Sequence, residues 1–97
     1  MTSSLDELDP TLTAPKRLSI VALLSRATDA DFTFLRDHLG VSDSDLSKQM
    51  AALVAAGHVS ARKSGRGRGS VTSYAITRHG RRTYERHRAA LRAILAE

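Results

Sequence analysis

The segment DFTFLRDHLGVSDSDLSKQMAALVAAG, residues 31–57, decides the fold that the sequence predicts. Two stretches with apolar residues at helical spacing flank the short linker GVS. Gly40 ends the first stretch, because glycine readily takes the positive φ of a helix terminus, and Ser42 is a typical N-cap for the second. Asp45, three residues later, resembles the second member of a capping box. Two helices joined by a short turn that contains glycine predict a helix-turn-helix over residues 31–57.

Another helix is expected before this unit. The run PKRLSIVALLSRA begins at Pro15 and has apolar residues three to four positions apart, which predicts a helix over residues 15–27. Proline suits the first turn of a helix, where its missing N–H costs nothing. Asp29 and Asp31 are alternative N-caps for the helix that follows. Further upstream, helical spacing indicates a short amphipathic turn or helix that contains Leu5, Leu8 and Leu12.

The pattern changes period after residue 57. Apolar and polar residues alternate on both sides of the glycine-rich stretch GRGRG, which predicts a β-hairpin over residues 58–77. Thr77 is a candidate N-cap for a final helix over residues 78–96. A helix, a helix-turn-helix, a hairpin and a last helix follow one another in the order of a winged helix. We therefore expect a single, mostly α-helical domain with a small β-hairpin, spanning residues 1–97.

Charge is divided unevenly along the chain. Residues 1–57 carry five Lys/Arg and eight Asp/Glu, a net charge of −3, whereas residues 58–97 carry ten and two, a net charge of +8; the halves sum to +5. A basic half of this kind is either a solvated surface or a contact for a polyanion, of which nucleic acid is the commonest.

The composition also excludes several classes of function. The chain has no cysteine, so disulfides, thiolate metal sites and a cysteine nucleophile are ruled out. Its four histidines lack the spacing of a metal site, and no acid pair or triad indicates catalysis, so we expect no enzyme, no metal and no cofactor. No apolar run is long enough to cross a bilayer, and the start MTSSLDELD is unlike a signal peptide, so we expect a cytoplasmic protein without a membrane partner.

The second helix of the helix-turn-helix is the first candidate for nucleic-acid contact. If Leu46, Met50, Leu53 and Val54 point inward, a narrow face of small and polar residues remains outside, which suits a major groove roughly 12 Å wide. That face contains Ser44, Lys48, Ala51 and Ala55, with Ser47 on its flank. The N-cap Ser42 and the free amides of the first turn suit a phosphate. Asp43 and Asp45 oppose a phosphate, although Asp45 could face the cap and either could accept a hydrogen bond from cytosine.

The hairpin tip is the second candidate. The segment RKSGRGRGS places positive side chains between glycines, so that arginine forks can approach a phosphate backbone or a narrow minor groove. The residues expected to contact DNA here are Arg62, Lys63, Arg66 and Arg68. A disordered RNA-binding tail also alternates Gly and Arg, but it lacks flanking strands. A nucleotide-binding loop is excluded, because no Gly-Lys-Ser/Thr follows.

The last helix predicts a contact with a second subunit. Its apolar stripe passes through Tyr84, Leu91, Ile94 and Leu95, and a core of three helices has little room for all of it. We therefore expect a homodimer in which the N- and C-terminal helices form the interface.

Three segments carry a family resemblance: LDPTLTAPKRLSIVALL, VSDSDLSKQMAALVAAGHV and TSYAITRHGRRTY. Together they resemble the small winged-helix transcriptional regulators related to the MarR and ArsR groups, over almost the whole chain. The resemblance implies a dimeric DNA-binding regulator, with wing contacts from Arg66 and Arg68. It also implies base and phosphate contacts from Ser42, Ser44, Ser47, Lys48 and Gln49. The chain departs from the pattern at Ser44 and Asp45, where relatives often have Asn or Gly.

These observations favour a sequence-specific transcriptional regulator that binds duplex DNA. The recognition helix would enter the major groove, the wing would lie on the backbone or in the minor groove, and half-sites would lie about 34 Å apart. One alternative is a winged-helix module that binds an acidic protein, and another is an RNA-binding protein. Nothing in the sequence marks a site for a small-molecule effector, so whether one binds stays open.

Overall fold

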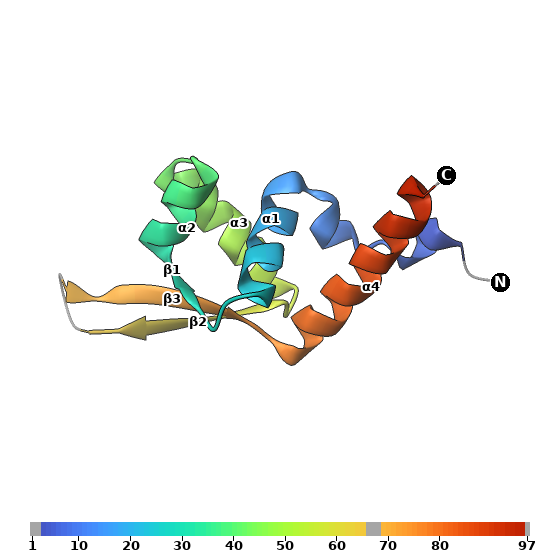
Figure 1. Cartoon of the computed structure of the whole chain (residues 1–97). Helices are drawn as coiled ribbons and strands as arrows, with labels where there is room; N and C mark the ends of the chain where they lie inside the picture. The colour runs from blue at the N-terminus through green and yellow to red at the C-terminus, as the bar shows by residue number, and fades with distance from the viewer. Residues whose placement is uncertain (1–2, 66–68, 97) are drawn as a thin grey trace.

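The computed structural model describes residues 3–65 and 69–96, which form four α-helices, two 3-10 helices and a three-stranded sheet (Figure 1). The elements are η1 (Ser4–Glu7), η2 (Pro10–Thr13), α1 (Pro15–Ser25), β1 (Ala30–Asp31), α2 (Phe32–Leu39), α3 (Asp43–Ala55), β2 (Val59–Ser64), β3 (Val71–Ile76) and α4 (Arg78–Leu95). The predicted winged-helix order of helix, helix-turn-helix, hairpin and helix is confirmed. Among the described residues, no helix is both long and apolar enough to pass through a membrane.

Helix boundaries follow from the expected capping residues. Asp31, Ser42 and Thr77 each accept a hydrogen bond from a backbone N–H in the first turn of α2, α3 and α4. Gly40 ends α2 with a φ of 69°, the left-handed conformation that glycine adopts without a steric penalty. Half of the predicted capping box at α3 forms: the Asp45 amide donates to Ser42, while the Asp45 carboxylate interacts with neighbouring side chains instead.

The sheet contains one strand more than the predicted hairpin. Its order is β1-β3-β2, and both pairs are antiparallel, with Ala30 opposite Tyr74 and Ala61 opposite Tyr74 on the other side. The additional strand β1 has only two residues, too few for an alternating pattern to be visible in the sequence. It ties the start of α2 to the middle of β3, and therefore fixes the helix-turn-helix relative to the hairpin.

The core lies between the helices and the base of the sheet. Its fully inaccessible apolar side chains come from η2 and the first three helices: Leu12, Ile20, Val21, Leu24, Leu35, Leu46 and Leu53. The expectation that Val54 is buried was wrong, since this side chain is 42% exposed near the end of α3. Leu12 packs in the domain's own core, so it is unavailable to the subunit interface that the sequence suggested for Leu5, Leu8 and Leu12.

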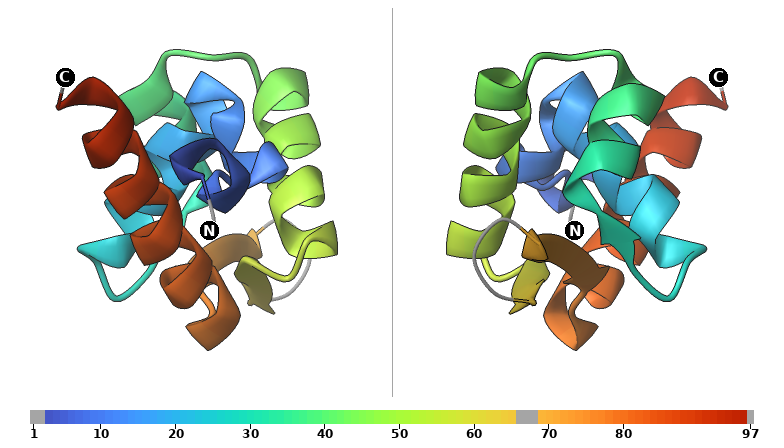
Figure 2. Two further views of the ribbon diagram at one scale, coloured as in Figure 1. Left: turned by 90° about the vertical axis from the view of Figure 1, so that its right-hand side faces the viewer. Right: turned by 90° about the vertical axis from the view of Figure 1, so that its left-hand side faces the viewer.

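The helices place two separate surfaces on the molecule. In the views along its length, α3 and α4 lie on opposite flanks with α1 between them (Figure 2). The hairpin projects beyond the helices at one end, whereas α4 and η1 pack together at the other end (Figure 1). The outer surfaces of α3 and α4 are therefore well separated.

Candidate nucleic-acid interface

The outer face of α3 is small, polar and exposed. Leu46, Met50 and Leu53 point into the core, so the opposite side of the helix faces solvent. That side presents Ser44, Ser47, Lys48, Ala51 and Ala55, all of them exposed. Ser42 caps the helix, and its hydroxyl lies 3.3 Å from that of Ser44. The N-terminal half of α3 thus offers hydroxyl groups and one cation with little bulk around them.

Both acidic residues in the first turn of α3 are paired with cations. Arg36 of α2 donates to Asp43 across 2.9 Å, and Lys16 of α1 pairs with Asp45. The hydrogen bond from Gln49, followed by that from Lys16, lowers the pKa of Asp45 below its ordinary value. The carboxylates are therefore partly offset by neighbouring positive charge, which reduces their repulsion of a phosphate near the helix N-terminus.

Gln49 is held against α1 instead of projecting from the outer face of α3. Its Oε1 accepts a hydrogen bond from Arg17 at 2.9 Å, and its Nε2 donates to Asp45 at 3.0 Å. Arg17 also donates from Nε to the carbonyl of Thr11 at 2.7 Å. The amide of Gln49 is engaged at both ends, and its role in this arrangement is to join α3 to α1.

The predicted wing residues divide between the two faces of the hairpin. Side chains alternate along a strand, so Ala61 and Lys63 share the face that looks toward α3. Arg62 lies on the other face, where it borders a hollow with Asp29 and Ser73. Arg66 and Arg68, also expected to contact DNA, lie outside the described residues.

A groove of about 410 Å³ separates α3 from the hairpin. Ser47 and Ala51 form part of one wall, and Ala61 and Tyr74 form part of the other. The outer face of α3 and the inner face of the hairpin therefore border the same groove. One extended ligand can contact both elements.

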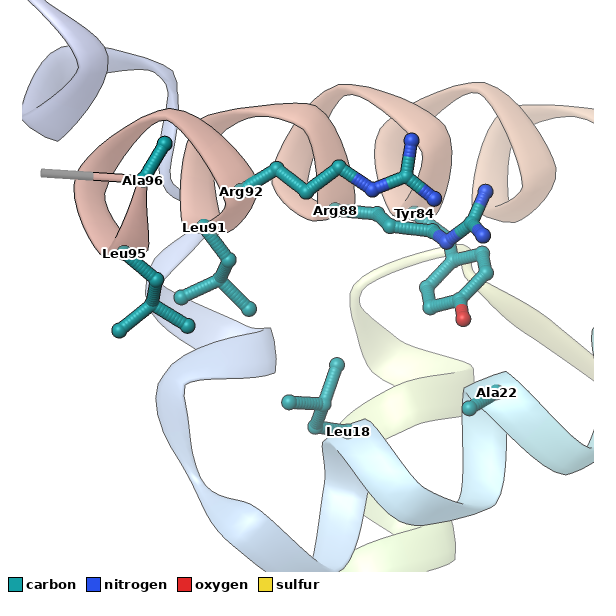
Figure 3. Close-up of a pocket in the computed structure, with 8 residues that line it drawn as sticks. All are labelled: Leu18, Ala22, Tyr84, Arg88, Leu91, Arg92, Leu95 and Ala96. Carbon is teal, nitrogen blue, oxygen red and sulfur yellow. The ribbon is translucent and has the colours of Figure 1, made fainter.

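A second groove, of about 570 Å³, lies between α1 and α4 on the opposite flank. Figure 3 shows Leu91 and Leu95 of α4 pointing toward Leu18 of α1, with Arg88 and Arg92 extending along α4 toward Tyr84. The apolar stripe predicted for the last helix is thus only partly covered by the domain. Leu95 is 78% exposed, and Ile94 is also exposed.

Two histidines are buried between the N-terminal segment and the rest of the domain. His87 of α4 is 1% exposed, and its Nδ1 accepts a hydrogen bond from the Asp9 amide. His58, between α3 and β2, is 2% exposed; its Nε2 lies 3.4 Å from Oδ1 of Asp9, and its ring stacks on His79. Within residues 3–65 and 69–96, no three His, Cys, Asp or Glu side chains are arranged to hold a metal ion.

Comparison with known proteins agrees with this geometry. The family described as a winged helix DNA-binding domain matches residues 16–95. The chain belongs to this family. The match includes α1, the helix-turn-helix, the hairpin and α4, so it contains both borders of the groove between α3 and the hairpin. No curated protein matches the sequence of this winged helix domain.

Several solved structures share the fold, among them a transcriptional regulator homologue and a possible transcriptional regulator. A transcriptional regulator homologue from Pyrococcus horikoshii OT3 has a TM-score of 0.83 and 26% identity, covering 89% of this winged helix domain and 85% of that chain. YusO from Bacillus subtilis has a TM-score of 0.80 at 18% identity, and the match covers 97% of this chain and 66% of that chain. A possible transcriptional regulator for arsenical resistance has a TM-score of 0.65 at 24% identity, and the match covers 97% of this chain and 85% of that chain. The resemblance to small winged-helix regulators is thereby confirmed.

Proposed function

We propose that this winged helix domain is a sequence-specific transcriptional regulator that binds duplex DNA as a homodimer. The observation that supports the proposal is the shared groove: Ser47 and Ala51 of α3 line one wall, and Ala61 of the hairpin lines the other. Lys63 lies two positions after Ala61 on the same face of β2, so a positive charge lies next to this groove. Duplex DNA is an extended polyanion that can meet both elements at once.

In the proposed complex, α3 enters the major groove. Ser44, Ser47 and Lys48 face the base edges, since they are exposed on one side of the helix and carry groups that can donate or accept hydrogen bonds. Ser42 and the amides of the first turn face a phosphate. Gln49 acts indirectly, through its contacts with Arg17 and Asp45, because both ends of its amide are already engaged.

The hairpin supplies contacts with the DNA backbone or the minor groove. Lys63 is suited to a phosphate near α3, because it lies on the inner face of β2 and is exposed. Arg66 and Arg68 are proposed as contacts from their place at the tip in the sequence. Arg62, on the outer face, would meet a phosphate only where the duplex curves around the hairpin.

A second copy of the chain is proposed to cover the groove between α1 and α4. Leu91 and Leu95 leave an apolar surface on the flank opposite α3, and an exposed apolar surface of this kind typically marks an interface. A two-fold axis along this flank would leave both recognition helices free. Each would then reach one half-site of a pseudo-palindrome, with the half-sites about 34 Å apart. Regulators with this fold are generally not enzymes, and we infer no catalytic activity and a cytoplasmic location.

The proposal is tested by selecting bound duplexes from a random pool and titrating the selected duplex at several salt concentrations. We expect log K to fall linearly with log salt, with a slope of about −0.9 for each neutralised phosphate. Replacing both Arg66 and Arg68 by Ala should weaken binding to all sequences. It should also make the slope less steep by about twice 0.9, one such amount for each lost phosphate contact. Failure to enrich any duplex, together with retention of an acidic protein, would support the protein-interaction alternative. Preference for single strands or for an A-form duplex would support RNA binding.

A further inference from the structure

The N-terminal segment Ser3–Thr13, which contains η1 and η2, is joined to α4 through His87. The backbone N–H of Asp9 donates to Nδ1 of His87 across 2.9 Å. A backbone N–H can only donate, so Nδ1 must carry a lone pair and the imidazole must be neutral, with its proton on Nε2. The observed contact therefore specifies one protonation state of a buried histidine.

We propose that His87 is a proton-operated latch, which holds the segment Ser3–Thr13 on α4 while the ring is neutral and releases it when the ring is protonated. A proton on Nδ1 would point at the N–H of Asp9, so that two donors would face each other. His87 is 1% exposed, and water cannot replace the lost contact without opening the segment. Protonation is thus coupled to movement of the chain around Asp9.

Burial sets the direction of the switch. Desolvation of the buried ring lowers the pKa of His87 below its ordinary value of 6.5, while the charge of Asp9 and a backbone hydrogen bond at Leu12 oppose that change. The latched form is therefore complete above pH 6.5 and is lost as the pH falls through the lowered pKa. Leu12 is fully buried next to this contact, so release of the segment also exposes part of the core.

Other charged groups face the latch from each neighbouring element. His58, from the turn between α3 and β2, approaches the Asp9 carboxylate, with His79 of α4 stacked on its ring. Glu7 of η1 lies 3.8 Å from Arg86 of α4, both of them partly exposed. These contacts involve side chains of the segment, whereas only His87 holds the Asp9 amide.

The segment also contacts the recognition helix indirectly. The Thr11 carbonyl accepts from Nε of Arg17, whose Nη1 donates to Gln49 of α3. Gln49 in turn donates to Asp45 in the first turn of α3. Displacing η2 removes one of the two hydrogen bonds that orient Arg17. We therefore expect release of the latch to weaken DNA binding, and this second step rests on the proposed function.

The latch is tested by amide hydrogen exchange, measured by NMR at pH values between 7.5 and 5. For the wild-type chain, protection of the Asp9 amide should fall by up to about tenfold per pH unit as the pH drops from 6.5, the ordinary value, towards the lowered pKa of His87, after correction for intrinsic exchange. In His87→Asn, an amide oxygen takes the place of Nδ1 and does not titrate, so protection should stay constant. His38→Asn removes an exposed histidine from α2 and should behave like the wild-type chain.

Two results would overturn the latch. One is Asp9 protection in the wild-type chain that does not change with pH, a measurement that needs no variant. The other is loss of protection in folded His87→Asn at the same pH as in the wild-type chain. His87→Gln, which also presents an amide oxygen, replaces the first variant if that one fails to fold.

Coupling to DNA is tested separately with the selected duplex at fixed salt. Between pH 7.5 and 5.5, the wild-type chain should lose more affinity than His87→Asn, which keeps the other three histidines and their added charge. Equal losses in the two proteins would overturn the coupling. Absence of duplex binding at every pH would overturn the proposed function instead, and the latch would still be decided by exchange at Asp9.

Discussion

Gly80, in the first turn of α4, lies directly against the backbone of His58. A Cβ atom built on Gly80 would stand 2.1 Å from the carbonyl oxygen of His58, and that oxygen accepts the N–H of Thr77 at 3.0 Å. Thr77 also donates to the carbonyl of Gly57 at 2.6 Å. The start of α4 is thus packed on the turn between α3 and β2, which fixes the helix to the base of the wing.

The first prediction concerns this close approach. Gly80→Ala should destabilise the domain by roughly 2 kcal/mol or more, because the overpacking penalty against backbone exceeds the gain of about 1 kcal/mol in helix propensity. Urea unfolding at pH 7.5 measures the change. Gly69→Ala is the matched control, since a Cβ at Gly69 meets nothing within 4 Å. An unchanged midpoint for Gly80→Ala would show that the turn at His58 yields easily.

The second prediction separates the two faces of the hairpin. Lys63→Ala should flatten the log–log salt dependence of DNA binding by about 0.9, as expected for one lost phosphate contact. Arg62→Ala removes the same charge from the adjacent position on the outer face of β2, and should change the slope less. Fluorescence anisotropy with the selected duplex measures both. Equal changes would mean that the duplex does not lie on the α3 side of the hairpin.

The third prediction concerns base reading by α3. If Lys48 pairs with guanine, Lys48→Ala should lower affinity by about 1–3 kcal/mol and relax the preference at one base pair. Titration of single-base operator variants measures this. Arg82→Ala removes the same charge from α4, on the flank opposite α3, and should keep every base preference. A Lys48→Ala protein that still discriminates among all variants would place Lys48 on the backbone.

The fourth prediction tests the subunit interface. Leu95→Glu should convert a dimer into a monomer of about 10.5 kDa, because a carboxylate would be buried at the interface. Light scattering on a sizing column measures the mass at micromolar concentration. The folded monomer should keep its stability, because Leu95 is 78% exposed. Phe34→Glu is the control, since this side chain is an exposed apolar group on α2. A monomeric wild-type protein would contradict the proposed dimer.

The fifth prediction is a pH dependence of stability. Burial lowers the pKa of His87, so the unfolded chain binds more protons than the folded chain below the ordinary value of 6.5. The contribution of His87 to the free energy of unfolding should therefore be constant above pH 6.5. It should decrease as the pH drops from there through the lowered pKa. Urea unfolding from pH 8 to pH 5 should show a smaller decrease for His87→Asn. If the free energies of unfolding of the two proteins fell in parallel with pH, His87 would not be the cause of the pH dependence.

Much of the fold could be predicted because its signals are local. The capping residues Asp31, Ser42 and Thr77 and the left-handed Gly40 each act within one helical turn, so their residue types suffice. Strand β1 could not be predicted, since its two residues form a strand only by pairing with β3, more than 40 positions later. The burial of Leu12 likewise depends on its packing against distant elements.

The candidate site could be predicted in part. The helical period predicted Ser44 and Lys48 on the outer face of α3 and Ser47 on its flank, and all three are exposed. The engagement of Gln49 depends on Arg17, 32 positions earlier, and no short pattern reveals that contact. Strand alternation alone could have predicted that Arg62 and Lys63 lie on opposite faces of the hairpin, because neighbouring residues of a strand point to opposite faces. The contact between Asp9 and His87 joins positions 78 apart and leaves no sequence signal.

The hairpin is packed on the core as far as Tyr74 of β3, which pairs with Ala61 on one side and Ala30 on the other; among the described residues nearer the tip, none is buried. The length of its outer part is therefore independent of the packing that stabilises the domain. Inserting one residue pair across the two strands would extend the reach by roughly 3.3 Å, and two pairs would also preserve which side chains face α3. The distance between contacts made by the helix and by the tip can therefore change in evolution, or by engineering, in steps of strand length.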